Sequence, residues 1–364
     1  MIRQLMLRLG SHIDGFLLAA ISAVMLYGLL VLYSATGQDF ERVSSQMVNI
    51  AVALAIMWIL ANIPPQHLLR LAIPAYVLGL VLLIGVALFG EVSHGARRWL
   101  SIGVGRIQPS EFMKIAVPMM LAWYFDFRQA TLRIKDFALA ALLLVVPVGL
   151  IVRQPDLGTA LLIAASGFYV LFFAGLSWKI IVGLIAAGAA STPVLWSLMH
   201  DYQRQRILTL FDPTQDPLGA GYHIIQSTIA LGSGGFEGKG WLRGSQAHLD
   251  FLPERHTDFI FAVLGEEFGM LGSLLLLLLF SIIIGRGLVI ASNATTLSGR
   301  LLAGSITLTF ATYAFVNIGM VSGILPVVGV PLPLVSYGGT SMVTLLLGFG
   351  ILMSVQTHRK LVKS

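Results

Sequence analysis

The stretch Phe251–Glu267, which reads FLPERHTDFIFAVLGEE, holds the residues best suited to chemistry. It passes from a polar loop into an apolar helix, and a carboxylate kept at the mouth of such a helix is a candidate functional group. We expect Asp258 to act as a general base, with His256 beside it as a binding residue. The alternative, which spacing alone leaves open, is a helix N-terminal Asp that only offsets the macrodipole.

A second polar group lies in the stretch from residue 95 to 114, GARRWLSIGVGRIQPSEFMK. Glu111 and Lys114 are three residues apart, on one face of the helix that Pro109 begins. They predict an intramembrane ion pair in which Lys114 binds an anionic headgroup and Glu111 orients it. An ordinary surface pair beside an interfacial tryptophan is the alternative. The candidate binding residues of this stretch are Arg97, Arg98, Trp99 and Gln108.

The segment RQPDLGTA adds a third carboxylate. Pro155 ends one apolar run, and Asp156 directly precedes the next. Asp156 therefore fits a helix cap with no further role, or a binding residue of the same site.

A loop of ~58 residues, 200–257, is far longer than ordinary connections, and ordered loops of that length are usually functional. It contains an amphipathic helical pattern from Tyr222 that includes Gln226 and is typical of an interfacial helix. The glycines around Lys239 do not match a phosphate-binding P-loop, although a flexible loop near an anionic substrate stays open. Arg204 and Arg206 are candidate phosphate ligands, or contacts to lipid headgroups.

Composition identifies the class of protein. The chain has 364 residues, of which 57% are hydrophobic and 11% charged, and its mean hydropathy is +0.86. Soluble domains carry about 25% charged residues, so this is a polytopic helical membrane protein. The absence of cysteine excludes disulfides, thiolate catalysis and cysteine metal sites. The net charge of +6 gives no reason to expect nucleic acid as a partner.

No tight histidine pair predicts zinc. A divalent cation such as magnesium or manganese, bound with a substrate diphosphate, is compatible with the carboxylates.

We predict an all-α fold: one membrane domain, 1–364, with ten transmembrane helices and a large extracytoplasmic loop between spans 7 and 8. The expected spans are 13–34, 46–63, 71–90, 110–126, 137–153, 157–175, 178–199, 258–285, 300–321 and 340–357. The N-terminus leads into a first span and shows no cleavage pattern typical of a signal peptide. The distribution of Lys and Arg among the short loops places both termini in the cytoplasm, and Asp258 then faces outside.

The segment 316–341 contains three prolines, five glycines and little charge between two spans. Irregular backbone at membrane depth is tolerated where it is buried in protein or lines a cavity. We therefore expect an extended or re-entrant segment packed against the bundle.

These motifs resemble the SEDS family (shape, elongation, division and sporulation proteins), most closely its rod-shape branch. The resemblance covers essentially the whole chain. The residues that carry it are Gln108-Pro-Ser-Glu111 with Lys114, Gln154-Pro-Asp156-Leu-Gly-Thr159, the stretch from Phe251 to Asp258, Asn317, and the run from Gly323 to Ser336-Tyr-Gly-Gly339.

The resemblance implies a peptidoglycan glycosyltransferase of the bacterial cytoplasmic membrane that polymerises lipid II on the outer face during cell elongation. It implies as partners a class B penicillin-binding protein, the elongation machinery and membrane lipids. The family's essential aspartate maps onto Asp258, and its conserved Glu and Lys map onto Glu111 and Lys114. Ser336 is carried over as a binding residue.

Two other functions remain open. Intramembrane charges and broken helices also mark transport paths, so a lipid II flippase is the main alternative. A non-catalytic scaffold for the penicillin-binding protein is the second.

Overall fold

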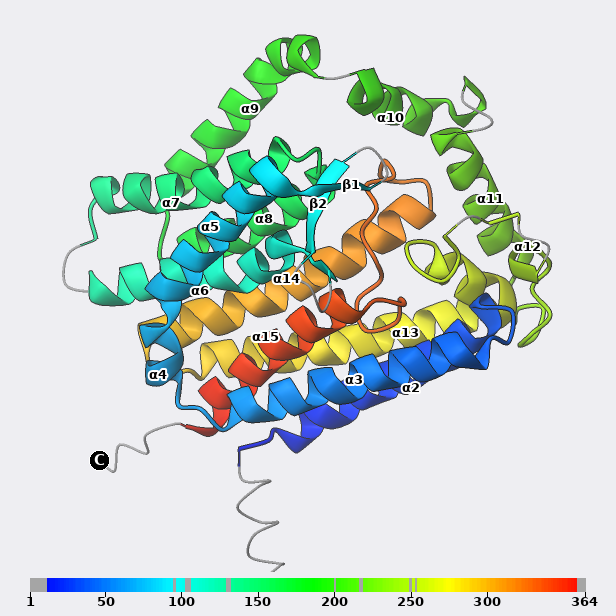
Figure 1. Cartoon of the computed structure of the whole chain (residues 1–364), viewed down its shortest axis with the longest axis horizontal. Coiled ribbons are helices and arrows are strands. Elements are labelled where there is room, and N and C mark those ends of the chain that lie inside the picture. Colours follow the sequence, from blue (N-terminus) through cyan, green and yellow to red (C-terminus); the bar gives the residue numbers. More distant parts are fainter. Residues whose placement is uncertain are drawn as a thin grey trace, which may run out of the picture.

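The structure, a computed structural model, describes residues 12–93, 96–101, 106–128, 132–199, 201–215, 219–248, 251–252 and 254–358. Long helices form a bundle, and the strands lie near the middle of the view (Figure 1). The helices are α2 (Gly15–Ala35), α3 (Phe40–Ala61), α4 (Pro65–Arg70), α5 (Ala72–Phe89), α6 (Pro109–Phe127), α7 (Ile134–Val152), α8 (Leu157–Phe173), α9 (Trp178–Leu198), α10 (Asp201–Phe211), α11 (Ala220–Ser233), α12 (Ser245–His248), α13 (Ile260–Ser292), α14 (Leu297–Val321) and α15 (Gly339–Thr357), with a 3₁₀ turn, η1, at Pro213–Gln215.

Every predicted span coincides with a helix. Within the described ranges, seven helices are long and apolar enough to cross a membrane: α2, α3, α5, α7, α13, α14 and α15. Helix α8 is shorter, at 17 residues, and α6 carries Glu111, Lys114 and Asp126. The chain is therefore a polytopic membrane protein, and α6 keeps its charges because most of its side chains are buried inside the bundle.

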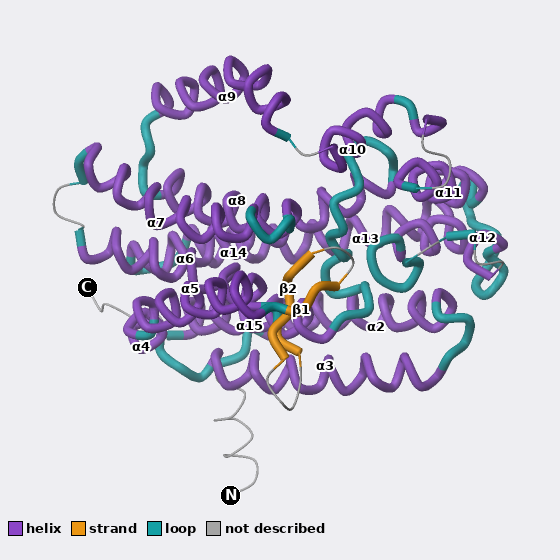
Figure 2. Tube along the Cα trace, turned by 45° about the horizontal axis from the view of Figure 1, so that its top comes forward, coloured by secondary structure: helices purple, strands orange, loops and turns teal. Residues whose placement is uncertain are grey.

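The interior of the bundle is formed around α6 and α14. Small residues let neighbouring helices approach α14 closely, as is usual in membrane bundles. Ser305 on α14 donates a 2.7 Å hydrogen bond to the carbonyl of Ser166 on α8. By contrast, α9 exposes apolar side chains along its length, including Val182, Ile185 and Val194, and lies at the edge of the bundle in both views (Figure 1, Figure 2).

The segment before α6 differs from the all-α prediction. It contains three short antiparallel strands in the order β1–β2–β3: β1 (Glu91–Ser93), β2 (Ala96–Ser101) and β3 (Arg106–Ile107). Figure 2 shows β1 and β2 together against the helices. The strands are too short for a readable alternation of polar and apolar residues. They hold Arg98 and Trp99 in front of α6.

The long loop also contains more regular structure than expected. The predicted helix at Tyr222 is confirmed as α11, but it packs on protein: Ser227 is fully buried and donates a 2.9 Å hydrogen bond to the carbonyl of Val321 at the end of α14. Helix α10 and the short α12 were not predicted.

Helix α13 is interrupted at Gly269, where φ is 62° and ψ is −155°. The glycine-rich loop supplies the missing backbone partners. The amides of Lys239 and Gly240 donate to the carbonyls of Glu266 and Glu267, both at 3.0 Å. In return, the amides of Met270 and Leu271 donate to the loop carbonyls of Gly235 (3.0 Å) and Phe236 (3.1 Å). A side chain at Gly238 would collide with the carbonyl of Glu267, which explains a glycine there.

Candidate functional site

A cavity of about 220 Å³ lies where β2, α6, α8, α14 and the turn before α13 meet the irregular segment between α14 and α15. Seven predicted site residues line it: Arg98, Trp99, Gln108, Glu111, Lys114, Asp156 and Asp258. The structure thus brings together residues up to 160 positions apart in the sequence. Thr159, Thr257, Tyr313, Gly329, Pro331, Tyr337 and Gly338 complete most of the wall.

Lys114 is the buried cation of this cavity, with 5% of its surface exposed. Its Nζ donates to Glu111 Oε1 and also contacts the hydroxyl of Tyr313 on α14. The other oxygen of Glu111, Oε2, is buried and accepts no hydrogen bond within the described part of the chain. The predicted ion pair is confirmed, and Tyr313 is a third member that the sequence analysis missed.

Arg98 and Asp156 form a second ion pair on the cavity wall. Arg98 Nε lies 3.8 Å from Asp156 Oδ2, and Arg98 Nη2 donates to the carbonyl of Pro155 at 2.9 Å. Gln108 Nε2 donates to the same Asp156 oxygen at 3.2 Å. Asp156 Oδ1 accepts the amide of Thr159 at 3.3 Å, so this carboxylate both caps α8 and lines the cavity.

Asp258 is the carboxylate of the cavity that has no protein partner: it accepts no hydrogen bond and forms no ion pair with any residue that the structure describes. It lies in the turn before α13, and Phe259, not Asp258, occupies the cap position. A role limited to capping is therefore not what this geometry shows. Burial, with the charge of Glu254, raises the pKa of Asp258 to about 6, while the charge of Arg98 opposes the rise.

Asn317 fixes the backbone around Asp258. It is fully buried on α14, and its Nδ2 donates to the carbonyls of Asp258 (2.8 Å) and Val330 (2.7 Å). Tyr313 precedes it by one helical turn, so the two side chains lie on one face of α14. Polar residues spaced four apart in an apolar span are the sequence signal that would have identified this face, and the sequence analysis did not use it.

The irregular segment between α14 and α15 is packed against protein, as predicted: Val330, Leu332 and Val335 are each no more than 2% exposed. Ser336 lies behind the cavity wall, where its hydroxyl donates to the carbonyl of Thr257 at 2.6 Å and accepts the amide of Leu332 at 2.8 Å.

His256 also supports the wall. Its carbonyl accepts the amide of Tyr337 at 2.9 Å, and its ring meets the Tyr337 ring edge-on at 6.1 Å. Burial and the charge of Arg42 lower the pKa of His256 below its ordinary value, while the charge of Glu254 opposes the shift.

Besides Ser336 and His256, five predicted binding residues are not part of the cavity lining: Arg204, Arg206, Tyr222, Gln226 and Lys239. Arg204 donates to the carbonyls of Trp196 and Ser197 at the end of α9. Lys239 pairs with Glu266 at 2.7 Å and donates to Ser245 at 2.9 Å. The side chain of Arg97 lies outside the described part.

Glu266 and Glu267, deeper in α13, both pack against polar partners. Glu266 accepts from Lys239, from Ser245 and from the amide of Gln246. Glu267 accepts from Ser34 on α2.

No group of three His, Asp or Glu side chains suited to a metal ion occurs among the described residues. The residues present therefore fit a cation only if a bound ligand supplies most of its oxygens, as magnesium sites with diphosphates do.

Known proteins confirm the family. A family model of cell cycle proteins, named for FtsW, RodA and SpoVE, matches residues 12–361. The peptidoglycan glycosyltransferase MrdB of Escherichia coli K12 is 53% identical over 351 residues, which cover 96% of this chain and 95% of MrdB.

Two solved structures are similar throughout. A chain from the structure described as "Structural coordination of polymerization and crosslinking by a peptidoglycan synthase complex" superposes with a TM-score of 0.83 and 34% identity, covering 95% of this chain and 99% of that chain. The Rod shape determining protein RodA of Thermus thermophilus superposes with a TM-score of 0.72 and 30% sequence identity, and the match covers 95% of this chain and 98% of that chain. The chain belongs to the FtsW/RodA/SpoVE family, which the sequence motifs predicted.

Proposed function

We propose that this protein is a peptidoglycan glycosyltransferase that polymerises lipid II on the outer face of the cytoplasmic membrane. The observation that carries the proposal is one cavity holding an unpartnered carboxylate, Asp258, beside a buried cation, Lys114. Membership of the family and 53% identity to MrdB over nearly the whole chain support it.

The reaction moves a sugar from a diphosphate to a hydroxyl. Asp258 takes the proton of the acceptor hydroxyl, whose oxygen forms the new bond to the anomeric carbon. The bond from that carbon to the diphosphate oxygen breaks, and its electron pair leaves with the undecaprenyl diphosphate. One displacement with inversion converts the α-linked donor to a β-linkage, so no enzyme nucleophile is needed.

The leaving diphosphate gains charge in the transition state, and positioned cations stabilise it. Lys114, held by Glu111 and Tyr313, is one candidate, and Arg98, which lines the same cavity, is another. A magnesium or manganese ion bound with the diphosphate would add positive charge, with Asp156 as its protein ligand. Chelation tests this: polymerisation that persists unchanged in EDTA excludes the metal.

The same proposal sets the topology. Ten spans with both termini in the cytoplasm place the cavity toward the outside, within reach of a polyprenyl-linked substrate. A class B penicillin-binding protein of the elongation machinery is the proposed partner, which the similarity to a chain of a peptidoglycan synthase complex supports.

Lipid II polymerisation by the purified chain in detergent, with the partner's transpeptidase inhibited, tests the function. Glycan product supports the enzyme. Translocation of lipid II across a bilayer without product indicates a flippase, and neither result indicates a scaffold.

A further inference from the structure

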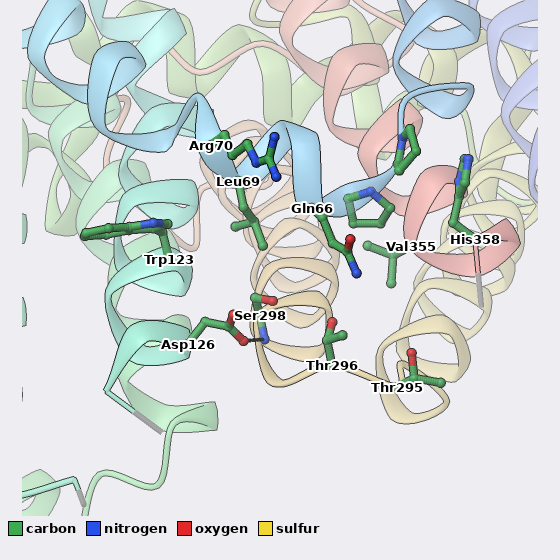
Figure 3. Close-up of a pocket in the computed structure, with 12 residues that line it drawn as sticks. Gln66, Leu69, Arg70, Trp123, Asp126, Thr295, Thr296, Ser298, Val355 and His358 are labelled. Carbon is green, nitrogen blue, oxygen red and sulfur yellow. Dashed lines mark hydrogen bonds between the residues drawn. The ribbon is translucent and has the colours of Figure 1, made fainter. Parts of the chain in front are cut away.

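A second, larger cavity of about 630 Å³ lies at the opposite end of α6 and α14 (Figure 3). It is bounded by α4, the end of α6, the turn before α14 and the end of α15. Asp126 follows Glu111 by 15 residues on α6, which is about 22 Å along a helix. This cavity is therefore separate from the glycosyltransferase site.

One wall carries an uncommitted positive charge. Arg70, at the end of α4, lines the cavity and forms no ion pair or side-chain hydrogen bond with the residues described. Gln66, one turn earlier on α4, lines the cavity beside it.

The facing wall carries a carboxylate and a hydroxyl. Asp126 Oδ1 accepts the amide of Ser298 at 3.2 Å, and Figure 3 shows the two residues together across the cavity from Arg70. Ser298 is only 2% exposed, yet its hydroxyl has no hydrogen-bond partner in the described ranges. Because Ser298 lines the cavity, its hydroxyl is available to a ligand bound there.

The rim beside Arg70 and Trp123 is apolar and exposed. Leu71 follows Arg70 and is 56% exposed, and Phe127 is 73% exposed. The Phe127 ring stacks with Trp123 at 5.7 Å. Aromatic residues of this kind typically lie at the level of lipid headgroups. A ligand entering here would thus have apolar chains outside the cavity and a polar group inside.

We propose that this cavity binds the headgroup of an aminophospholipid such as phosphatidylethanolamine. The phosphate lies against Arg70 and Gln66, and the ammonium group donates to Asp126 and to the hydroxyl of Ser298. The opposite charges on facing walls favour this zwitterion over a purely anionic headgroup, because Asp126 repels a second negative group.

Native mass spectrometry of the full chain, titrated in detergent with dioleoylphosphatidylethanolamine or dioleoylphosphatidylglycerol, tests the proposal. We expect one tightly retained phosphatidylethanolamine and weaker binding of phosphatidylglycerol. Arg70→Gln removes a charged hydrogen-bond donor and should weaken the retained lipid about tenfold. The control is Arg300→Gln, which removes an exposed arginine from the first turn of α14 that does not line the cavity.

Asp126→Asn should abolish the preference for phosphatidylethanolamine. Because it also alters the start of α14, Ser298→Ala provides a second variant, expected to weaken binding while the melting temperature is kept. Equal or stronger binding of phosphatidylglycerol to the natural chain, or unchanged binding in Arg70→Gln, would overturn the proposal. Displacement of the retained lipid by soluble glycerophosphoethanolamine would support recognition of the headgroup. The readout is binding, so it is independent of polymerisation.

Discussion

The two cavities lie at opposite ends of the same two helices, α6 and α14. They differ in which of their charged side chains has a partner in the protein. Among the residues that the structure describes, the Asp258 end has its cations Lys114 and Arg98 paired with carboxylates of the protein, and an acid is left without a partner. At the Arg70 end, the carboxylate Asp126 holds the start of α14, and within the same described ranges the cation Arg70 has no partner. These two groups are the ones available to a ligand: Asp258 is a proton acceptor in one cavity, and Arg70 is a positive charge in the other.

The largest difference between the two cavities should appear when Asp258 and Arg70 are neutralised one at a time. Asp258→Asn keeps the size of the side chain and removes the base, so polymerisation should fall by about 10²–10⁴-fold. Arg70→Gln, at the other end, should leave polymerisation within about twofold. Lipid II polymerisation by the purified variants measures both. A normal rate for Asp258→Asn would remove the base assignment.

The paired charges provide the next test. Lys114→Met leaves the buried carboxylate of Glu111 without its cation, which typically costs about 3–5 kcal/mol, and polymerisation should fall by about 10²-fold or more. The double variant Glu111→Gln with Lys114→Met should recover much of the lost melting temperature without recovering the rate. If the rate returned together with the stability, Lys114 would have only a structural role.

Substitution of Asn317, which lies beside Asp258, should have a smaller effect on polymerisation. Asn317→Leu removes two hydrogen bonds and leaves the carbonyls of Asp258 and Val330 unsatisfied, at about 1–3 kcal/mol each. We expect a lower melting temperature and about tenfold slower polymerisation, since the turn bearing Asp258 loses its anchor. Asn317→Asp serves as a matched variant: it keeps the size but replaces the donating group. Wild-type rates in both variants would contradict the anchoring role.

The smallest effect concerns pH. A base must be deprotonated to act, so the rate should rise with pH through about 6, the pKa of Asp258, and then level off. Arg98 lowers that pKa by its charge. Arg98→Gln should therefore move the midpoint to higher pH; because it also removes a cation proposed to stabilise the diphosphate, the plateau rate should fall as well, and the midpoint is the quantity that tests the electrostatic effect. A rate profile of both proteins checks this, and a midpoint that does not move would exclude Arg98 as an electrostatic neighbour.

The sequence was informative where residues in contact are close along the chain or mark a span. The contact between Glu111 and Lys114 follows from helical spacing, and the ten apolar runs each match a helix. Contacts between distant segments could not be predicted in the same way. Gln108 donates a hydrogen bond to Asp156, which lies 48 residues further along the chain. Lys114 contacts Tyr313, which lies 199 residues further along. The packing of α8 and α14 on α6 decides both contacts.

The polar loop before α13 shows that composition can also suggest a function that the structure does not support. Lys239 and the glycines around it have a composition typical of anion-binding loops, yet the backbone of this stretch is hydrogen-bonded to α13. A glycine-rich composition indicates that a loop can adopt unusual backbone angles. It does not indicate which group the loop backbone binds.

The interruption at Gly269 has a mechanical result. Since the glycine-rich loop and α13 share backbone hydrogen bonds on both sides of the break, neither can open without the other. The amides of Gly240 and Met270 should consequently exchange with deuterium at one common rate. A force applied to this loop by a bound protein would be delivered to α13, the helix that begins just after Asp258.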